Sequence, residues 1–328
     1  MSTQEIARAQ SAASAVAPVG VAAGAETRGA MSAGATADTR GALTGSARAG
    51  AARARARRPR TRSIYRWELL KLRAQKRTYL GLGSAVVVPL IFLVALAANG
   101  GGPEEVPFGR YVTETGLAVP PVLLLFSSIW LFPLIVSLVA GDIVANEDGN
   151  GTLKTILTRS ADRQQVFLAK VLASFTYAVG ALLLFVATGL LLGGLRYGFD
   201  PLTSLSGTRI ETGRGLLLLG GAVLAYLIPV LTIASIALLL STVTRNSAAA
   251  VVGALMLSLI MQIVGVISGL EGIRPYLIST QFDAWQGLLR EPVDWAPIVR
   301  SAWVCALYAV PSLIAAMIVF MRRDVTGG

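Results

Sequence analysis

The chain contains no histidine and a single cysteine, Cys305, among its 328 residues. The absence of histidine removes the commonest general base and metal ligand, and with it zinc metalloproteases and histidine-dependent serine hydrolases. One cysteine cannot form a disulfide framework. The sequence also has no phosphate-binding P-loop pattern and no Gly-x-Ser-x-Gly turn. We therefore expect no catalytic centre, metal or cofactor in this chain.

Charged residues are also scarce. They make up 14% of the chain, whereas soluble domains carry roughly 25%. Hydrophobic residues make up 54%, and the mean hydropathy is +0.64. Several apolar runs exceed the length of about 18 residues that indicates a bilayer-crossing helix. These features predict an all-α membrane protein.

Six transmembrane helices are predicted within a membrane domain at residues 80–328. Their approximate ranges are 80–98, 117–140, 166–195, 215–243, 247–270 and 301–321. Four of them contain a proline that favours a kink, namely Pro89, Pro133, Pro229 and Pro311. Two Gly-x-x-x-Gly pairs, Gly189–Gly193 and Gly265–Gly269, would let helices approach closely.

The N-terminal 60 residues form a separate segment. They contain 20 Ala and 9 Arg but few large apolar residues, so they cannot bury enough surface to offset the entropy of ordering. We expect a disordered tail; an organelle transit peptide is the alternative.

Residues 61–79 predict an amphipathic interfacial helix that lies in the headgroup plane. Its basic face holds Arg62, Arg66, Arg73 and Arg77, and Ile64, Trp67 and Ala74 lie roughly opposite.

The net charge of +11 comes entirely from the N-terminal region, because residues 1–77 hold 15 Lys and Arg against 4 Asp and Glu. Nucleic-acid binding is the rival interpretation of such a tail. Basic residues beside a bilayer are, however, the ordinary orientation signal. We therefore expect membrane lipids as partners, no nucleic acid, and both termini in the cytoplasm of a cell whose plasma membrane holds the protein.

The predicted external loop at 271–300 is the longest connection on its side of the membrane. It mixes Trp285 and Trp295 with charge and proline. We expect a short interfacial helix there, with tryptophans at headgroup level.

A polar block between the second and third spans is the most informative stretch, and we define a coupling loop at 141–165 within it. Gly149–Gly151 can turn the chain sharply. The segment 152–158 predicts a short helix with Leu153, Ile156 and Leu157 on one face, suited to a groove on a partner protein. A plain solvated loop is the alternative. Charge pairs at the rim would come from Asp142, Glu147, Asp148, Arg159, Asp162 and Arg163.

This block resembles the ABC-2 type permeases, the membrane subunits of many ABC exporters. The matching residues are Glu147, Gly151, Thr152, Leu153, Ile156, Leu157, Arg163 and Lys170. The basic helix before the first span and Arg322–Arg323–Asp324 after the last are also similar, while Ser160 stands where many members have proline. The resemblance implies a separate cytoplasmic subunit that binds and hydrolyses ATP, coupled through the loop, and a second permease copy or paralogue.

Two other functions stay open. One is an ion-coupled secondary carrier that acts alone, although such carriers usually keep a carboxylate at membrane depth, and the predicted spans have none near their centres. The other is a membrane scaffold subunit that does not transport.

Overall fold

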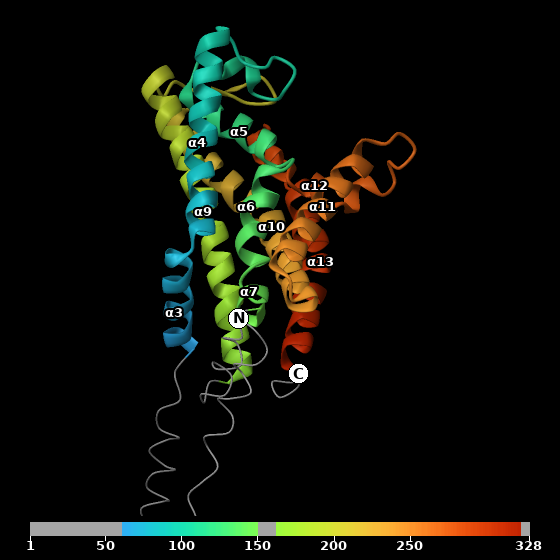
Figure 1. The fold of residues 1–328 in the computed structure, drawn as a ribbon. Helices are drawn as coiled ribbons and strands as arrows, with labels where there is room; N and C mark the ends of the chain where they lie inside the picture. The colour runs from blue at the N-terminus through green and yellow to red at the C-terminus, as the bar shows by residue number, and fades with distance from the viewer. Residues whose placement is uncertain (1–60, 150–161, 323–328) are drawn as a thin grey trace, which may run out of the picture. The chain divides into compact units, whose positions relative to one another are not determined.

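A computed structural model describes residues 61–149 and 162–322 (Figure 1). The predicted disordered tail and the predicted short helix at 152–158 lie outside these ranges.

Helices account for most of the described residues. The α-helices are α3 (Thr61–Ala74), α4 (Lys76–Asn99), α5 (Val119–Ser127), α6 (Leu131–Ala140), α7 (Ala145–Gly149), α9 (Arg163–Tyr197), α10 (Thr212–Thr244), α11 (Ser247–Val266), α12 (Ile278–Gln281) and α13 (Ala296–Met321). Short 3-10 helices are η1 (Gly109–Tyr111), η2 (Gly116–Ala118), η3 (Arg274–Tyr276) and η4 (Ala284–Leu289). One antiparallel hairpin, not anticipated from the sequence, joins β1 (Leu202–Thr203) to β2 (Arg209–Ile210), with Leu202 opposite Ile210.

Within residues 61–149 and 162–322, five helices are long and apolar enough to cross a membrane: α4, α9, α10, α11 and α13. The pair formed by α5 and α6 raises the number to six if the two are counted as one span. The prediction of an all-α membrane protein is therefore confirmed, while the sixth span depends on how this pair is counted.

The predicted second span is sharply bent. Its two parts meet at an angle of 66° around residues 128–130. Pro133, the third residue of α6, explains the position of the bend. Proline lacks an N–H group, and its ring would clash with the carbonyl of Ile129 in a continuous helix. The chain restarts its helical bonding when the Leu134 N–H donates to the Trp130 carbonyl at 2.9 Å.

The predicted interfacial helix ends earlier than expected. α3 ends at Ala74, Gln75 is extended, and residues 76–79 already belong to α4. The boundary at residue 79 was wrong because amphipathic periodicity continues across this break. α3 packs against α9 and continues below α4 in Figure 1. Whether it lies in a headgroup layer stays a prediction.

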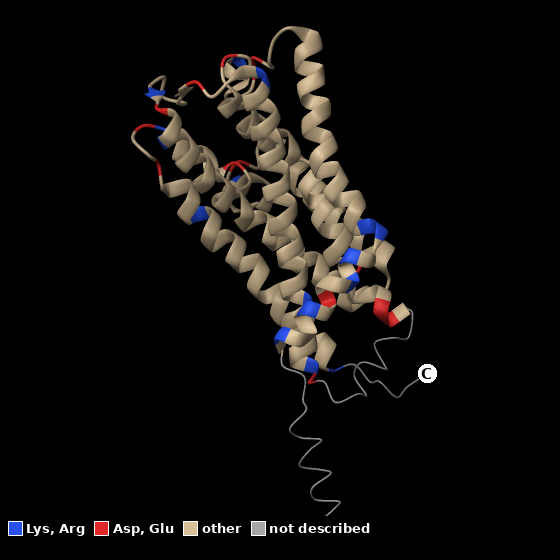
Figure 2. Ribbon diagram, turned by 90° about the vertical axis from the view of Figure 1, so that its left-hand side faces the viewer, with Lys and Arg blue, Asp and Glu red and all other residues tan. Residues whose placement is uncertain are grey.

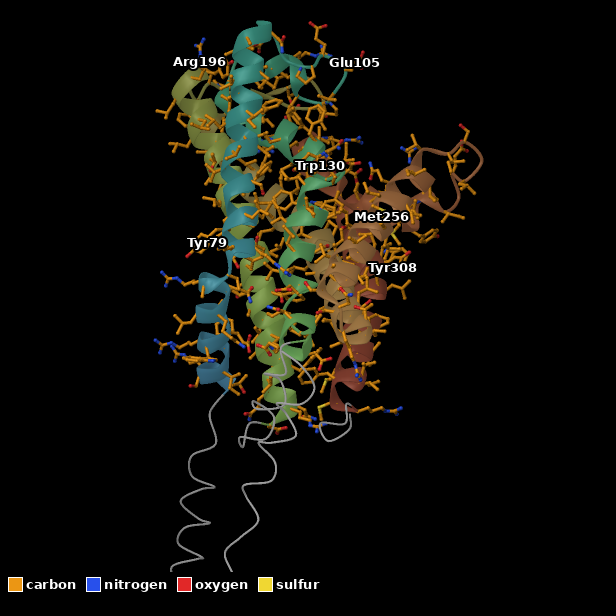
Figure 3. All side chains as sticks on the ribbon, in the orientation of Figure 1. Tyr79, Glu105, Trp130, Arg196, Met256 and Tyr308 are labelled. Atoms are coloured by element: carbon orange, nitrogen blue, oxygen red, sulfur yellow. The ribbon has the colours of Figure 1, made fainter. Side chains whose placement is uncertain are left out.

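Charged residues lie mainly at the two ends of the bundle (Figure 2). We call one the basal end: it contains α3, α7, the first turns of α9 and the last turn of α13. The other, the distal end, contains residues 100–118 and 198–211. Glu105 and Arg196 lie at the distal end, and Tyr79 lies near the junction of α3 with α4 (Figure 3).

α10 lies at the centre of the packing and contacts α6, α9, α11 and α13. Its fully buried Tyr226 makes edge-on ring contacts with Phe132 of α6 and with Phe282, at centroid distances of 5.4 and 5.0 Å. The predicted close approach at Gly189–Gly193 is confirmed. A Cβ atom at Gly193 would lie 2.8 Å from a methyl carbon of Val119, and one at Gly189 would lie 2.6 Å from Leu123. α9 thus packs tightly against α5.

The segment between α11 and α13 differs from the predicted external loop. It begins after Val266 and ends before Ala296. Trp285, expected at headgroup level, has no exposed surface and stacks on Phe108 at 6.3 Å, whereas Trp295 is exposed. Trp285 is buried because η4 packs against α10 and α13, which a local sequence pattern does not reveal; its position at headgroup level stays a prediction.

Candidate functional site

The basal end holds a group of charges that come together from three separate helices. α7 is the helix of interest for coupling in this group. It is the last described element before residues 150–161, the middle of the predicted coupling loop. Glu147 of α7, Lys170 of α9, and Glu68 and Lys71 of α3 make the contacts. We call these four residues the ion cluster.

Lys170 is the innermost member of the ion cluster. Its side chain has no exposed surface, and its Nζ lies 2.6 Å from Glu147 Oε2 and 3.3 Å from Glu68 Oε1. The same Nζ donates a hydrogen bond to the Ile143 carbonyl at 3.1 Å. Burying an ammonium group is costly unless charges and acceptors surround it. Two carboxylates and one carbonyl meet that requirement here.

Lys71 completes the ion cluster from the outside. Its Nζ lies 2.7 Å from Glu68 Oε1 and also contacts Glu147 Oε1. Burial alone would lower the pKa of Lys71, but the carboxylates of Glu147 and Glu68 together outweigh burial and raise the pKa above its ordinary value. Lys71 is therefore charged at neutral pH and faces the two carboxylates from the outside.

A second group of polar contacts centres on Asp142, which precedes Glu147 of the ion cluster by five residues in the chain. The carboxylate of Asp142, in the turn between α6 and α7, accepts hydrogen bonds from Arg77 at the start of α4 and from Ser247 at the start of α11. Arg77 also donates to the Ser247 hydroxyl at 2.6 Å. Asp142 is buried, so it links two apolar helices through a single side chain.

α10 also holds α7. The Ser241 hydroxyl accepts hydrogen bonds from the backbone N–H groups of Val144 and Ala145 at 3.3 and 3.0 Å, which satisfies donors at the start of α7. Arg245, which follows α10, lies 3.6 Å from the carboxylate of Asp148. The segment 142–148 is therefore attached to α3, α4, α9, α10 and α11.

The structure brings together only some of the site residues predicted from the sequence. Glu147 and Lys170 come together directly, whereas Arg163 donates to the Met321 carbonyl at 2.9 Å and joins α9 to α13. Arg62, Arg66, Trp67 and Arg73 are exposed on α3, while Arg77 lies in α4 and contacts Asp142. The predicted coupling residues Gly151, Thr152, Leu153, Ile156 and Leu157 lie outside the described residues.

Sequence reasoning missed several members of the site, among them Glu68, Lys71 and Ser241. Glu68 carried a detectable signal, because it is the only acidic residue between positions 61 and 80 and lies three residues before Lys71 on one helical face. Ser241 carried none, because its partners lie 96 and 97 residues away in the chain.

The site has no features of a metal centre. Within residues 61–149 and 162–322, no group of three or more His, Cys, Asp or Glu could hold a metal ion. Carboxylates in the ion cluster already face lysine ammonium groups. What the arrangement can do is transmit a displacement of α7 to several helices.

The fold and this site define an all-α membrane protein whose apolar helices are joined at one end by buried ion pairs. Within that class, the chain belongs to the family described as protein of unknown function DUF2705, which matches residues 112–326. It is also similar to the uncharacterized protein YhcI of Bacillus subtilis (strain 168), with 26% identity over 209 residues. That match covers 57% of this chain and 63% of the relative, less than two thirds of its length.

Proposed function

We propose that the chain is the membrane-spanning permease subunit of an ABC exporter of the ABC-2 type, located in the plasma membrane with both termini in the cytoplasm. It would form the translocation path with a second copy or a paralogue. A separate cytoplasmic subunit would bind and hydrolyse ATP. Movement of that subunit would reach the membrane helices through the coupling loop at 141–165.

One observation carries this proposal. Glu147, three residues before the segment 150–161, contacts Lys71 of α3 and Lys170 of α9. A partner that pulled on the loop would therefore act on two helices through one carboxylate. The caps and ion pairs at Asp142, Ser241 and Arg245 extend the same connection to α4, α10 and α11.

The first test is purification of the full chain from native membranes in mild detergent, with mass spectrometry of the bound proteins. We expect a soluble ATPase with a P-loop to copurify with the wild-type chain. Leu157→Asp, which places a charge on the predicted apolar face of the loop, should abolish its recovery. Thr113→Asp is the matched control, because it adds the same charge at an exposed position of the distal end, away from the ion cluster.

A second measurement separates binding from function. The purified chain alone should hydrolyse no ATP, and the reconstituted complex should do so. Recovery of the chain by itself, under conditions that hold other membrane complexes together, would contradict the proposal. Robust ATP turnover by the chain alone would contradict it as well.

An ion-coupled carrier is the second candidate, and the burial of Lys170 beside two carboxylates is the observation that favours it. Buried ionisable groups in membrane helices often serve ion or proton pathways. Transport that stops when the proton gradient is collapsed, with ATP still present, would favour this candidate. A non-transporting scaffold would bind the partner without any substrate-dependent change in ATP hydrolysis.

A further inference from the structure

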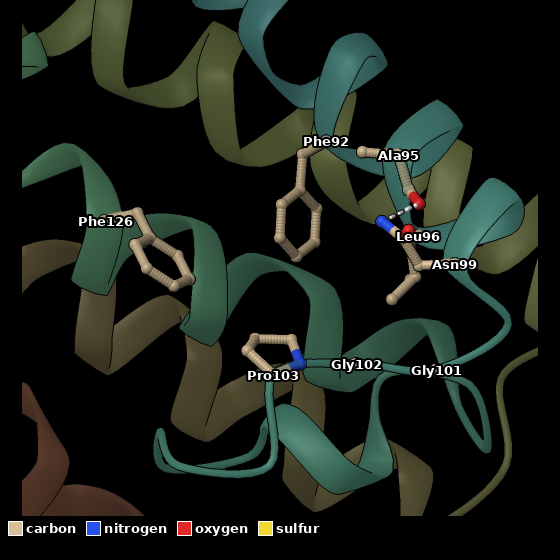
Figure 4. A pocket seen from close by; sticks show the side chains of 8 residues that line it. All are labelled: Phe92, Ala95, Leu96, Asn99, Gly101, Gly102, Pro103 and Phe126. Atoms are coloured by element: carbon tan, nitrogen blue, oxygen red, sulfur yellow. Dashed lines mark hydrogen bonds between the residues drawn. The ribbon is translucent and has the colours of Figure 1, made fainter.

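A groove that plays no part in the ion cluster lies beside α4. It lies near the distal end, between the last turns of α4 and α5, and its cavity volume is about 420 Å³ (Figure 4). This volume falls in the range of small-molecule sites, roughly 300–1,000 Å³. Its main lining residues are Phe92, Ala95, Leu96, Asn99, Pro103 and Phe126.

The groove changes in polarity along its length. Phe92 and Phe126 form its apolar end, with ring centroids 6.4 Å apart. Asn99 lies seven residues after Phe92, which is about 10 Å further along the helix. Its amide donates one hydrogen bond to the Ala95 carbonyl at 2.9 Å. The groove is therefore apolar toward the middle of α4 and polar at the end of α4, which matches the polarity of an amphiphile.

Gly101 and Gly102, in the glycine turn after α4, line the groove without adding a side chain to it. Gly100 ends α4 with a φ of 69°, a conformation that L side chains rarely adopt. A Cβ atom at Gly101 would meet nothing within 4 Å, whereas one at Gly102 would lie 2.0 Å from the Gly109 carbonyl oxygen. The chain thus turns back beside the groove without a side chain that fills it.

The surroundings indicate what fills the groove. Its lining residues Ala95, Asn99 and Phe126 are exposed, so the groove opens on an exposed face of the bundle. On a membrane-crossing helix this face lies in the hydrocarbon of the bilayer, and apolar cavities do not hold water well. An acyl chain from the surrounding bilayer is the apolar molecule available at that position.

The charges near the polar end of the groove select the headgroup. Glu104 and Glu105 are exposed directly after the glycine turn. Residues 100–115 hold three acidic residues, Glu114 included, against one basic residue, Arg110. An anionic headgroup would be repelled there, and an ammonium group would be attracted. We propose that the groove binds one acyl chain of a zwitterionic phospholipid, with its ammonium group beside Glu104 and Glu105.

The experiment uses the full chain in lipid nanodiscs that contain a phosphatidylcholine probe with a photoreactive diazirine in its acyl chain. After illumination, mass spectrometry locates the attached lipid. We expect labelling concentrated at Phe92, Leu96 and Phe126, above the level on the exposed residues Leu90 and Ile91. Ala95→Trp should fill the groove and lower this labelling by about tenfold.

Ala97→Trp is the matched control. Ala97 is also exposed on α4 but is not among the groove residues, so the same substitution should leave labelling unchanged. Even labelling along the whole outer face of α4 would overturn the proposal, as would unchanged labelling in Ala95→Trp. Cross-links between two copies of the chain through the groove would show that a second copy covers it instead.

The headgroup is tested with a phosphatidylglycerol probe that carries the same photoreactive chain. We expect weaker labelling of the groove by this anionic probe, and we expect Glu104→Gln/Glu105→Gln to remove the difference. Equal labelling of the wild type by both probes would overturn the headgroup assignment. The site does not depend on the chain being a transporter subunit.

Discussion

Lys170 of α9 and Glu147 of α7 form a buried ion pair, with 2.6 Å between Nζ and Oε2 and no exposed surface on the lysine side chain. The pair connects α9, one of the long apolar helices, to the segment that leads into the predicted coupling loop. Glu68 and Lys71 add α3 to the same contact. Packing at this end of the bundle and the proposed coupling therefore depend on the same side chains.

Lys170→Met should be strongly destabilising, because it removes the buried ammonium group that lies beside Glu68 and Glu147. Removing one member of a buried ion pair typically costs about 3–5 kcal/mol. Thermal unfolding in detergent measures the effect. Lys71→Met should cost less, because its side chain is partly exposed and Lys170 still contacts both carboxylates. Equal melting temperatures for wild type and Lys170→Met would contradict this.

A double variant separates the interaction between Glu147 and Lys170 from the cost of leaving one buried charge without its partner. Glu147→Gln combined with Lys170→Met removes both charges, so the double variant should be more stable than the sum of the two single losses indicates. A double-mutant cycle on the unfolding free energies measures the difference. Strict additivity would show that the two side chains do not interact.

Ser241→Ala should loosen the start of α7. It removes the acceptor for the Val144 and Ala145 N–H groups, and loss of a cap of this kind costs about 1 kcal/mol. Hydrogen exchange of residues 144–148 should become faster. Ser235→Ala is the matched control in the same helix, because the Ser235 hydroxyl only bonds the Leu231 carbonyl one turn earlier. Equal exchange in both variants would argue against the cap.

Gly193→Ala should destabilise the contact between α9 and α5, since its Cβ atom would lie 2.8 Å from Val119 and 3.0 Å from the Gly116 carbonyl oxygen. Gly180→Ala, in the same helix, has nothing within 4 Å of the new atom. Alanine should there be neutral or stabilising by about 0.5–1 kcal/mol. Melting temperatures of the two variants should therefore move apart; a shift in the same direction and of equal size would refute the close approach.

Glu147→Lys tests the proposed coupling. The new ammonium would face Lys71 and Lys170, so we expect α7 to move and recovery of the ATPase partner to fall, while the protein remains in the membrane. Membrane fractionation and copurification measure the two effects separately. A variant that is inserted, binds the partner and transports normally would argue that the ion cluster has no part in coupling.

The apolar helices could be predicted from the sequence to within a few residues at most ends, because the length and hydropathy of a run are local properties. The bend in the second span was anticipated only as a kink at Pro133. The buried position of Trp285 was not anticipated, because the same tryptophan pattern suits a headgroup layer. The residues 151–157 that define the resemblance lie outside the described ranges, so their role stays a prediction.

By itself, the sequence determined that the chain is helical, that it crosses a membrane several times, and that a polar block separates its second and third apolar runs. Hydrophobicity and helical periodicity are local properties that show within one or two helical turns, so they can be read from the sequence alone. Only the tertiary structure decided that Lys170 faces Glu147 and Glu68, that Asp142 joins α4 to α11, and that α10 caps α7. These contacts join side chains from 23 to 105 residues apart, and only the packing of the helices brings them together.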